Sequence, residues 1–153
     1  MASIKSDRYT TGFMVGVIAG LIADAVSFIL SNLLKMGKVS YEDFAAVLIY
    51  GSRASTVPEI IFAHLVQLFF SALVGALFVF WIRKVTDRFL IFKGICYGLF
   101  VWFFAFSVAQ LYKLQFLSRL DLITVIQNYV AAITYGVVLG LTLRTLDKKP
   151  KQK

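Results

Sequence analysis

The sequence predicts an all-α integral membrane protein, folded as a four-helix bundle in a single domain over residues 1–153. The chain is 59% hydrophobic and 16% charged, with a mean hydropathy of +0.81, so it lacks the polar surface that a soluble domain of this size needs. Its charges fall in short clusters, and the apolar runs between them reach about 20 residues, the length that crosses a bilayer. We expect four spans, at about residues 12–34, 57–82, 90–112 and 121–145.

The first span carries Gly12, Gly16, Gly20 and Asp24, each four residues after the last. Residues at this spacing lie on one face of a helix, and a face of small residues lets a second helix come close in lipid. A carboxylate near the centre of a span costs about 2.5–3.5 kcal/mol on insertion scales. We therefore expect Asp24 to have a partner, to be protonated, or to line a wet cavity. A helix-packing role and a binding or proton-carrying role both stay open.

The loop after this span contains a second helical signal. The segment Ser40-Tyr41-Glu42-Asp43 is typical of a helix N-terminus, with acids in the first turn where they suit the helix dipole. We expect a short helix over residues 41–50 at the membrane surface, with Gly51 ending it.

Polar residues of the second and fourth spans point to a shared pocket. His64 and Gln67 share a face of the second span, and Asn128 and Tyr135 lie in the fourth. If these faces converge on the first span, they form a polar pocket open toward the outside with Asp24 at its floor. The candidate residues of this pocket are Asp24, His64, Gln67, Asn128 and Tyr135.

Glycines recur in the later spans at the spacing of the first. Gly94 and Gly98 in the third span parallel Gly12 and Gly16, and Gly75 in the second has counterparts in the fourth. This pattern fits two repeated helical hairpins related by an axis along the membrane normal, although glycines are also common in membrane helices generally. The predicted helix-packing glycines are Gly12, Gly16, Gly20, Gly75, Gly94, Gly98, Gly136 and Gly140.

The basic residues predict the orientation. Of the 16 Lys and Arg residues, eleven lie before the first span, between spans two and three, or after the fourth. Five lie on the other side, so the positive-inside rule places both termini in the cytoplasm. The basic C-terminal tail has no interleaved aromatic residues, which argues against nucleic-acid binding and favours contact with the lipid bilayer.

Little in the sequence points to catalysis. The chain has one His and one Cys and carries no nucleophile, phosphate-binding or metal-binding motif, so we expect no enzyme activity, metal or cofactor. The first function class is a membrane scaffold or accessory subunit that packs through small-residue faces against other membrane proteins or a second copy. The alternative is a small oligomeric transporter or channel-like protein handling a proton, cation or small solute in the Asp24 pocket. The direction in which the first-span glycines point discriminates between them.

One family resemblance rests on the last two spans. Gly94-Ile95-Cys96-Tyr97-Gly98, then Val101-Trp102-Phe103-Phe104, and Tyr135-Gly136-Val137-Val138-Leu139-Gly140 in the fourth span, resemble the YqhR-like membrane proteins of spore-forming Gram-positive bacteria. The likeness covers mainly residues 90–145. It implies a small four-span protein of the bacterial cytoplasmic membrane and adds no catalytic residues.

Overall fold

The computed structural model describes residues 8–32, 37, 39–85, 89–114, 117 and 120–147. Within them the chain forms five α-helices and no strand: α1 (Arg8–Asn32), α2 (Tyr41–Tyr50), α3 (Val57–Val85), α4 (Leu90–Leu111) and α5 (Leu122–Asp147). The long helices α1, α3, α4 and α5 are each long and apolar enough to cross a membrane. The predicted all-α, four-span architecture is therefore confirmed, and residues 33 and 34 of the first predicted span lie outside the described residues.

The short helix α2 has the predicted bounds because its end signals are local. The Ser40 N–H donates to the Asp43 carboxylate at 2.8 Å, which satisfies one backbone donor at the helix start. Gly51 adopts a left-handed conformation with φ of 72°, and its N–H donates to the Val47 carbonyl at 2.9 Å. Glycine adopts this conformation without strain, so the helix ends there.

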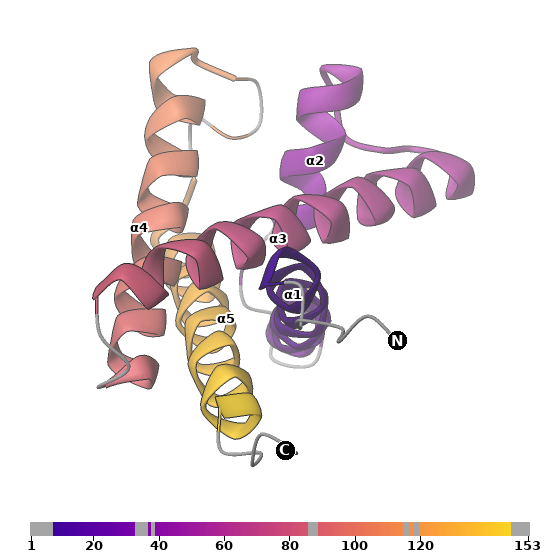
Figure 1. Ribbon diagram of the computed structural model, residues 1–153. Helices are drawn as coiled ribbons and strands as arrows, with labels where there is room; N and C mark the ends of the chain where they lie inside the picture. The colour runs from indigo at the N-terminus through magenta and orange to yellow at the C-terminus, as the bar shows by residue number, and fades with distance from the viewer. Residues whose placement is uncertain are drawn as a thin grey trace.

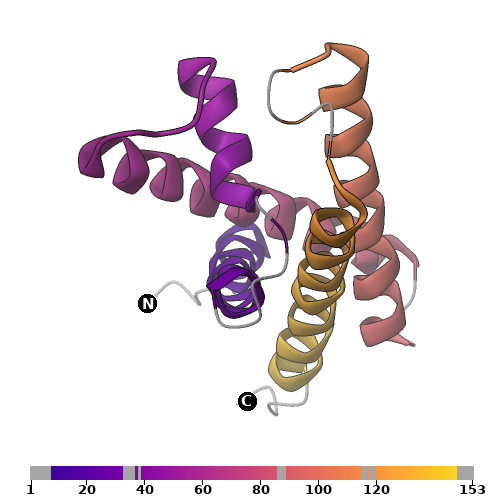
Figure 2. The same ribbon diagram turned by 180° about the vertical axis from the view of Figure 1, so that it is seen from behind.

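The long helices pack as two pairs, α1 with α3 and α4 with α5, and the pairs meet where α1 contacts α5. Figure 1 shows α3 running across the molecule, with α1 against it and the α4–α5 pair beside its C-terminal half. The reverse view shows α5 between α1 and α4 (Figure 2). The helix α2 packs Ala45 and Ala46 against Ala63 of α3. Its Phe44 ring packs in a tilted arrangement on Phe106 of α4, with ring centroids 4.9 Å apart.

The α1–α3 pair meets backbone to backbone. A Cβ added at Gly75 of α3 would lie 2.7 Å from the Gly12 carbonyl oxygen and 2.8 Å from the Gly16 nitrogen of α1. A Cβ at Gly16 would in turn lie 2.5 Å from the Ser71 carbonyl oxygen and 2.8 Å from the Ala72 Cα. No side chain fits at these positions, so van der Waals contact between backbones holds the pair, as is usual in lipid.

The α4–α5 pair uses the same device. A Cβ at Gly98 would lie 2.5 Å from the Ala132 carbonyl oxygen, and one at Gly140 would lie 2.6 Å from the Ile91 Cα. Gly94 and Gly136 face each other directly between these two contacts. Glycines thus occupy the interface within both helical hairpins, the α1–α3 pair and the α4–α5 pair. The matching glycine spacing of the first and third spans led us to expect glycines at both interfaces.

Two tyrosines join the hairpins. The Tyr135 hydroxyl of α5 donates to the Ser71 carbonyl of α3 at 2.6 Å, and the Tyr97 hydroxyl of α4 donates to the Val74 carbonyl at 2.9 Å. The Tyr97 ring also packs on Phe78, which is fully buried, with centroids 4.9 Å apart. Both acceptor carbonyls lie within one turn of α3, so the two bonds join the α4–α5 pair to the α1–α3 pair at the same depth along α3.

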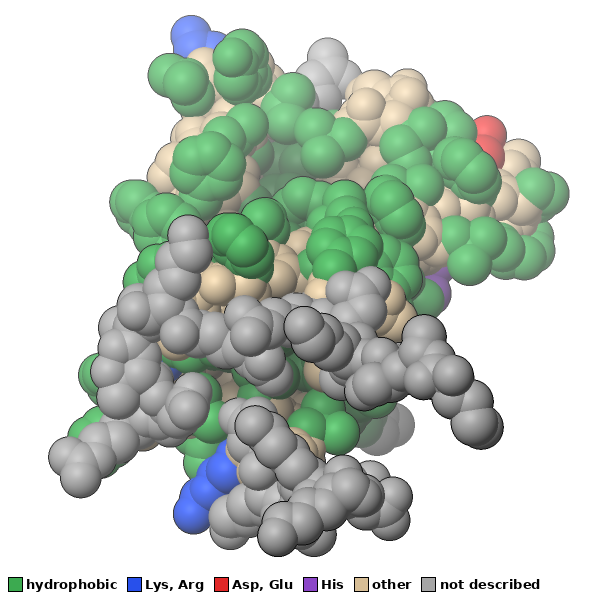
Figure 3. Space-filling model, in the orientation of Figure 1, with side chains coloured by type: hydrophobic (Ala, Val, Ile, Leu, Met, Phe, Trp, Pro, Cys, Tyr) green, Lys and Arg blue, Asp and Glu red, His purple; other side chains and the backbone are tan. Residues whose placement is uncertain are grey.

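The exposed surface of the long helices is apolar. Large hydrophobic side chains are exposed on every one of them, including Phe28, Phe80, Phe100 and Leu122, each at least 64% exposed. In the space-filling view, hydrophobic side chains cover most of the upper half of the visible face, while Lys and Arg side chains show at its upper and lower edges (Figure 3). A bilayer accommodates such a surface, and the chain is a multi-pass membrane protein.

Candidate functional site

A crevice of about 200 Å³ lies between the two hairpins and beside α2. Ala23 of α1, Phe70 and Val74 of α3, and Val101 and Ala105 of α4 form its largely apolar walls. The helices α3 and α4 meet at Tyr97 and diverge toward α2, which contacts both, and the crevice lies in this gap (Figure 1). Its polar lining residues are Asp24, Tyr41, Gln67, Ser71, Trp102 and Tyr135.

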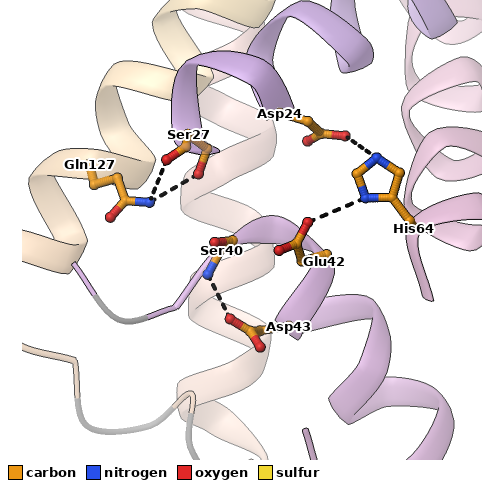
Figure 4. A network of polar contacts seen from close by, with 7 residues as sticks. All are labelled: Asp24, Ser27, Ser40, Glu42, Asp43, His64 and Gln127. Carbon is orange, nitrogen blue, oxygen red and sulfur yellow. Dashed lines mark hydrogen bonds and ion pairs between the residues drawn. The ribbon is translucent and has the colours of Figure 1, made fainter. Parts of the chain in front are cut away.

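Asp24 lies in the crevice wall opposite a histidine of α3. Its side chain is 11% exposed, and its Oδ2 atom lies 3.8 Å from His64 Nε2. That oxygen is buried and accepts no hydrogen bond from the described residues. His64 turns its other ring nitrogen, Nδ1, toward the Glu42 carboxylate of α2 at 3.3 Å (Figure 4). An imidazole from one helix therefore bridges carboxylates from two others.

A small polar hollow adjoins Asp24 on the side of α2. Its lining includes Ser27, Ser40 and Glu42, and its volume of about 20 Å³ is enough for a water molecule. Asp24 and Tyr41 line both this hollow and the crevice, so they form the boundary between them. Burial, with the charge of Asp24 second, raises the pKa of Tyr41 above its ordinary range. Tyr41 therefore stays a neutral donor, and its hydroxyl bonds the Asn128 carbonyl at 2.9 Å.

Two amide side chains of α5 serve the framework. Gln127 Nε2 donates to the Ser27 hydroxyl at 3.0 Å (Figure 4). It also donates to the Ser31 hydroxyl at 2.6 Å, and the two bonds tie α5 to α1. Asn128 Nδ2 donates to the Val39 carbonyl at 3.1 Å and holds the segment that leads into α2. Both amides are fully buried. Their amide nitrogens are hydrogen-bonded, which offsets part of the cost of burying them, while the Gln127 Oε1 and Asn128 Oδ1 atoms accept no hydrogen bond from the described residues.

The structure therefore divides the predicted polar pocket. Asp24, Gln67 and Tyr135 line the crevice together, and His64 contacts Asp24. Asn128 is not among the lining residues of the crevice; it fixes the entry to α2. A polar pocket was expected, but the walls are mainly apolar. The polar side chains of Ser27, Gln127 and Asn128 form bonds between segments of the chain and do not line the crevice. The predicted glycines belong to the helix interfaces, and Gly20 also borders the crevice.

Sequence reasoning missed two contributors to this site. Glu42 reads as a first-turn acid of α2, and nothing in the spacing of the sequence relates it to His64. Trp102 reads as one member of an aromatic run, yet its indole lines the crevice and its Nε1 donates no hydrogen bond to the described residues. Its ring packs on Phe106 and Tyr129, with centroids 5.0 and 5.4 Å away. A tryptophan interrupting a phenylalanine run was the one available signal.

The side chains that line the crevice are suited to binding. No group of three or more His, Cys, Asp or Glu side chains placed to hold a metal ion occurs in the part of the chain that the structure describes. The crevice offers apolar surface, aromatic rings and one buried carboxylate, which suit noncovalent recognition. Comparison of the chain with protein-family models, with curated proteins and with solved structures finds no match.

Proposed function

We propose that this protein is a non-enzymatic membrane protein that binds a small, largely apolar molecule in the crevice between its two hairpins. The observation that carries the proposal is the crevice itself, which has a volume of about 200 Å³ and a buried carboxylate in an apolar wall. Concave, mostly apolar sites with a few convergent polar groups are the usual form of small-molecule sites. Because most of the walls belong to membrane-spanning helices, the ligand is one that partitions into the bilayer.

The packing of the glycines supports binding over scaffolding. A scaffold that docks through the first-span stripe needs Gly12, Gly16 and Gly20 on its outer face. All three are buried and face α3 of the same chain. The stripe is therefore occupied within the monomer, and any self-association or contact with other membrane proteins would use different surfaces.

The orientation proposed for the chain follows the charge distribution. We place both termini in the cytoplasm of a bacterial cell, as the eleven-to-five distribution of Lys and Arg and the family resemblance favour. In a Cys96→Ser background, a cysteine at Ser52, between α2 and α3, should react with an impermeant maleimide from outside intact cells. A cysteine at Asp87, between α3 and α4, should react only after permeabilisation. The reverse pattern would refute this orientation.

Binding can be followed by the fluorescence of Trp102. The chain has two tryptophans, and Trp81→Phe leaves Trp102 as the single reporter inside the crevice. Purified protein in lipid nanodiscs would be titrated with 2-phenylethanol, with excitation of tryptophan alone. Partition into lipid gives a response linear in probe, whereas binding to a site saturates. We expect a saturating change in Trp102 emission.

A matched pair of substitutions locates the site. Ala105→Phe fills the crevice from α4, and Ser107→Phe adds the same ring two residues away on an exposed face of that helix. We expect saturable binding to disappear in the Ala105 variant and to persist in the Ser107 variant. A linear response in the parent protein, or equal binding by the two variants, would refute the proposed function.

A further inference from the structure

We propose that the crevice is selective for a singly charged cationic amphiphile, with an ammonium head against Asp24 and a short apolar tail along the walls. This inference rests on the proposed binding function and names the class of ligand. It is argued from the charge, the size and the lining of the crevice.

Acidic groups outnumber the one basic group at the polar end of the crevice. Two carboxylates, Asp24 and Glu42, flank the single imidazole of His64 at 3.8 and 3.3 Å. With both acids ionised, at least one negative charge remains uncompensated whether or not the imidazole is protonated. None of the described residues that line the crevice is Lys or Arg, and the nearby Arg53 pairs with Asp43 of α2 at 3.7 Å.

This charge acts where water is scarce. The Asp24 side chain is 11% exposed and borders an apolar crevice, so its field is screened much less than that of a surface carboxylate. An ammonium group entering the crevice gains a strong charge-assisted hydrogen bond and compensates a charge that is costly to bury unpaired. An anionic head would be repelled, and a neutral head would leave the carboxylate uncompensated.

The size and the aromatic lining set the rest of the ligand. A dry cavity of about 150 Å³ in another protein accommodates benzene, so a crevice of about 200 Å³ suits one ring with a short arm, or a chain of similar bulk. Phe44, Phe70 and Trp102 line it, and aromatic faces attract cations as well as apolar groups. A second charge on the ligand would lie against these apolar walls, which favours a monocation.

The test compares three probes that share a ring and differ in the head group. At neutral pH 2-phenylethylamine is a cation, 2-phenylethanol is neutral and phenylacetate is an anion. Each would be titrated into the Trp81→Phe protein in uncharged nanodiscs, with Trp102 emission as readout. We expect the cation to bind at least about tenfold more tightly than the alcohol, because a hydrogen bond to a charged group contributes that much to affinity. We expect phenylacetate to give no saturable response.

Two variants connect the selectivity to its source. Asp24→Asn should reduce the preference for the cation over the alcohol to about one, while the alcohol still binds. Glu42→Gln removes the second carboxylate from α2 without altering the crevice lining, and should reduce the preference by a smaller factor.

The outcomes separate the two proposals. Equal affinity for cation and alcohol in the parent protein would overturn the selectivity and leave the apolar-binding function standing. Unchanged selectivity in a folded Asp24→Asn protein would likewise overturn the role of Asp24. If none of the three probes saturates, both the selectivity and the proposed function fail. The parent comparison needs no variant, so the inference stays testable even where Asp24→Asn does not fold.

Discussion

Replacing Gly75 by alanine should drive α1 and α3 apart. The added methyl would lie 2.7 Å from the Gly12 carbonyl oxygen and 2.8 Å from the Gly16 nitrogen, whereas carbon needs about 3.5 Å or more. The obstructing atoms are backbone, so no rotamer change relieves the clash, and the helices must separate by about 1 Å. Overpacking of this kind costs about 1–3 kcal/mol, and the better helix propensity of alanine returns up to about 1 kcal/mol.

We therefore expect a net loss of about 1–2 kcal/mol in the free energy of unfolding. The measurement is equilibrium unfolding in mixed micelles of mild detergent and dodecyl sulfate, followed by tryptophan emission. Ala25→Leu is the matched control, because Ala25 is exposed on α1 and a larger apolar side chain there faces lipid. Gly98→Ala should behave like Gly75→Ala, since its methyl would meet the Ala132 carbonyl oxygen at 2.5 Å. A Gly75→Ala protein as stable as the parent would refute backbone contact as the basis of the pair.

Three further expectations concern the framework around the crevice. Tyr135→Phe removes the bond to the Ser71 carbonyl and should cost about 0.6 kcal/mol, and at most about 1.7, in the same assay. Gln127→Leu should cost more than Tyr135→Phe, because it removes bonds to two serine hydroxyls of α1 at once; an equal or smaller loss would argue against that network. The raised pKa of Tyr41 means that its contribution to stability is full below about pH 10 and declines as the pH rises toward the raised value. Stability measured against alkaline pH should thus fall less steeply in Tyr41→Phe than in the parent, and superimposable curves would contradict this.

Local signals account for what the sequence predicts well. The bounds of α2 follow from Ser40, Asp43 and Gly51, which act within the helix they delimit. The four spans follow from apolar runs that only a bilayer accommodates. The spacing of the glycines likewise identifies one face on each helix as an interface, because residues four apart must share a face.

The partners of those faces are a property of the folded chain. His64 and Glu42 belong to helices that α2 brings together by folding back on α3, and no spacing in the sequence encodes that approach. The same holds for Gln127, which bonds serines about a hundred positions away. Asn128, which was predicted to line the pocket, instead bonds the Val39 carbonyl, and the walls of the crevice are more apolar than predicted.

The contact between Asp24 and His64 has a consequence for how α1 and α3 align. The two helices run antiparallel, so each step of four residues forward along α1 faces a step of four residues back along α3. The residues that face each other in turn are Gly12 and Ala76, Gly16 and Ala72, Gly20 and Leu68, and Asp24 and His64. A glycine at every fourth position presents nearly the same surface after a slip of one turn, about 5.4 Å, so the stripe by itself permits several registers.

The acid removes that degeneracy. A slip of one turn in either direction would set Asp24 opposite Leu68 or Ile60, at the cost of about 2.5–3.5 kcal/mol for a carboxylate among apolar groups in a span. The polar pair thus specifies a single register on a periodic interface, as a lone polar residue does in a coiled coil. The glycines determine how closely α1 and α3 approach each other, and Asp24 determines their register along the helix axis.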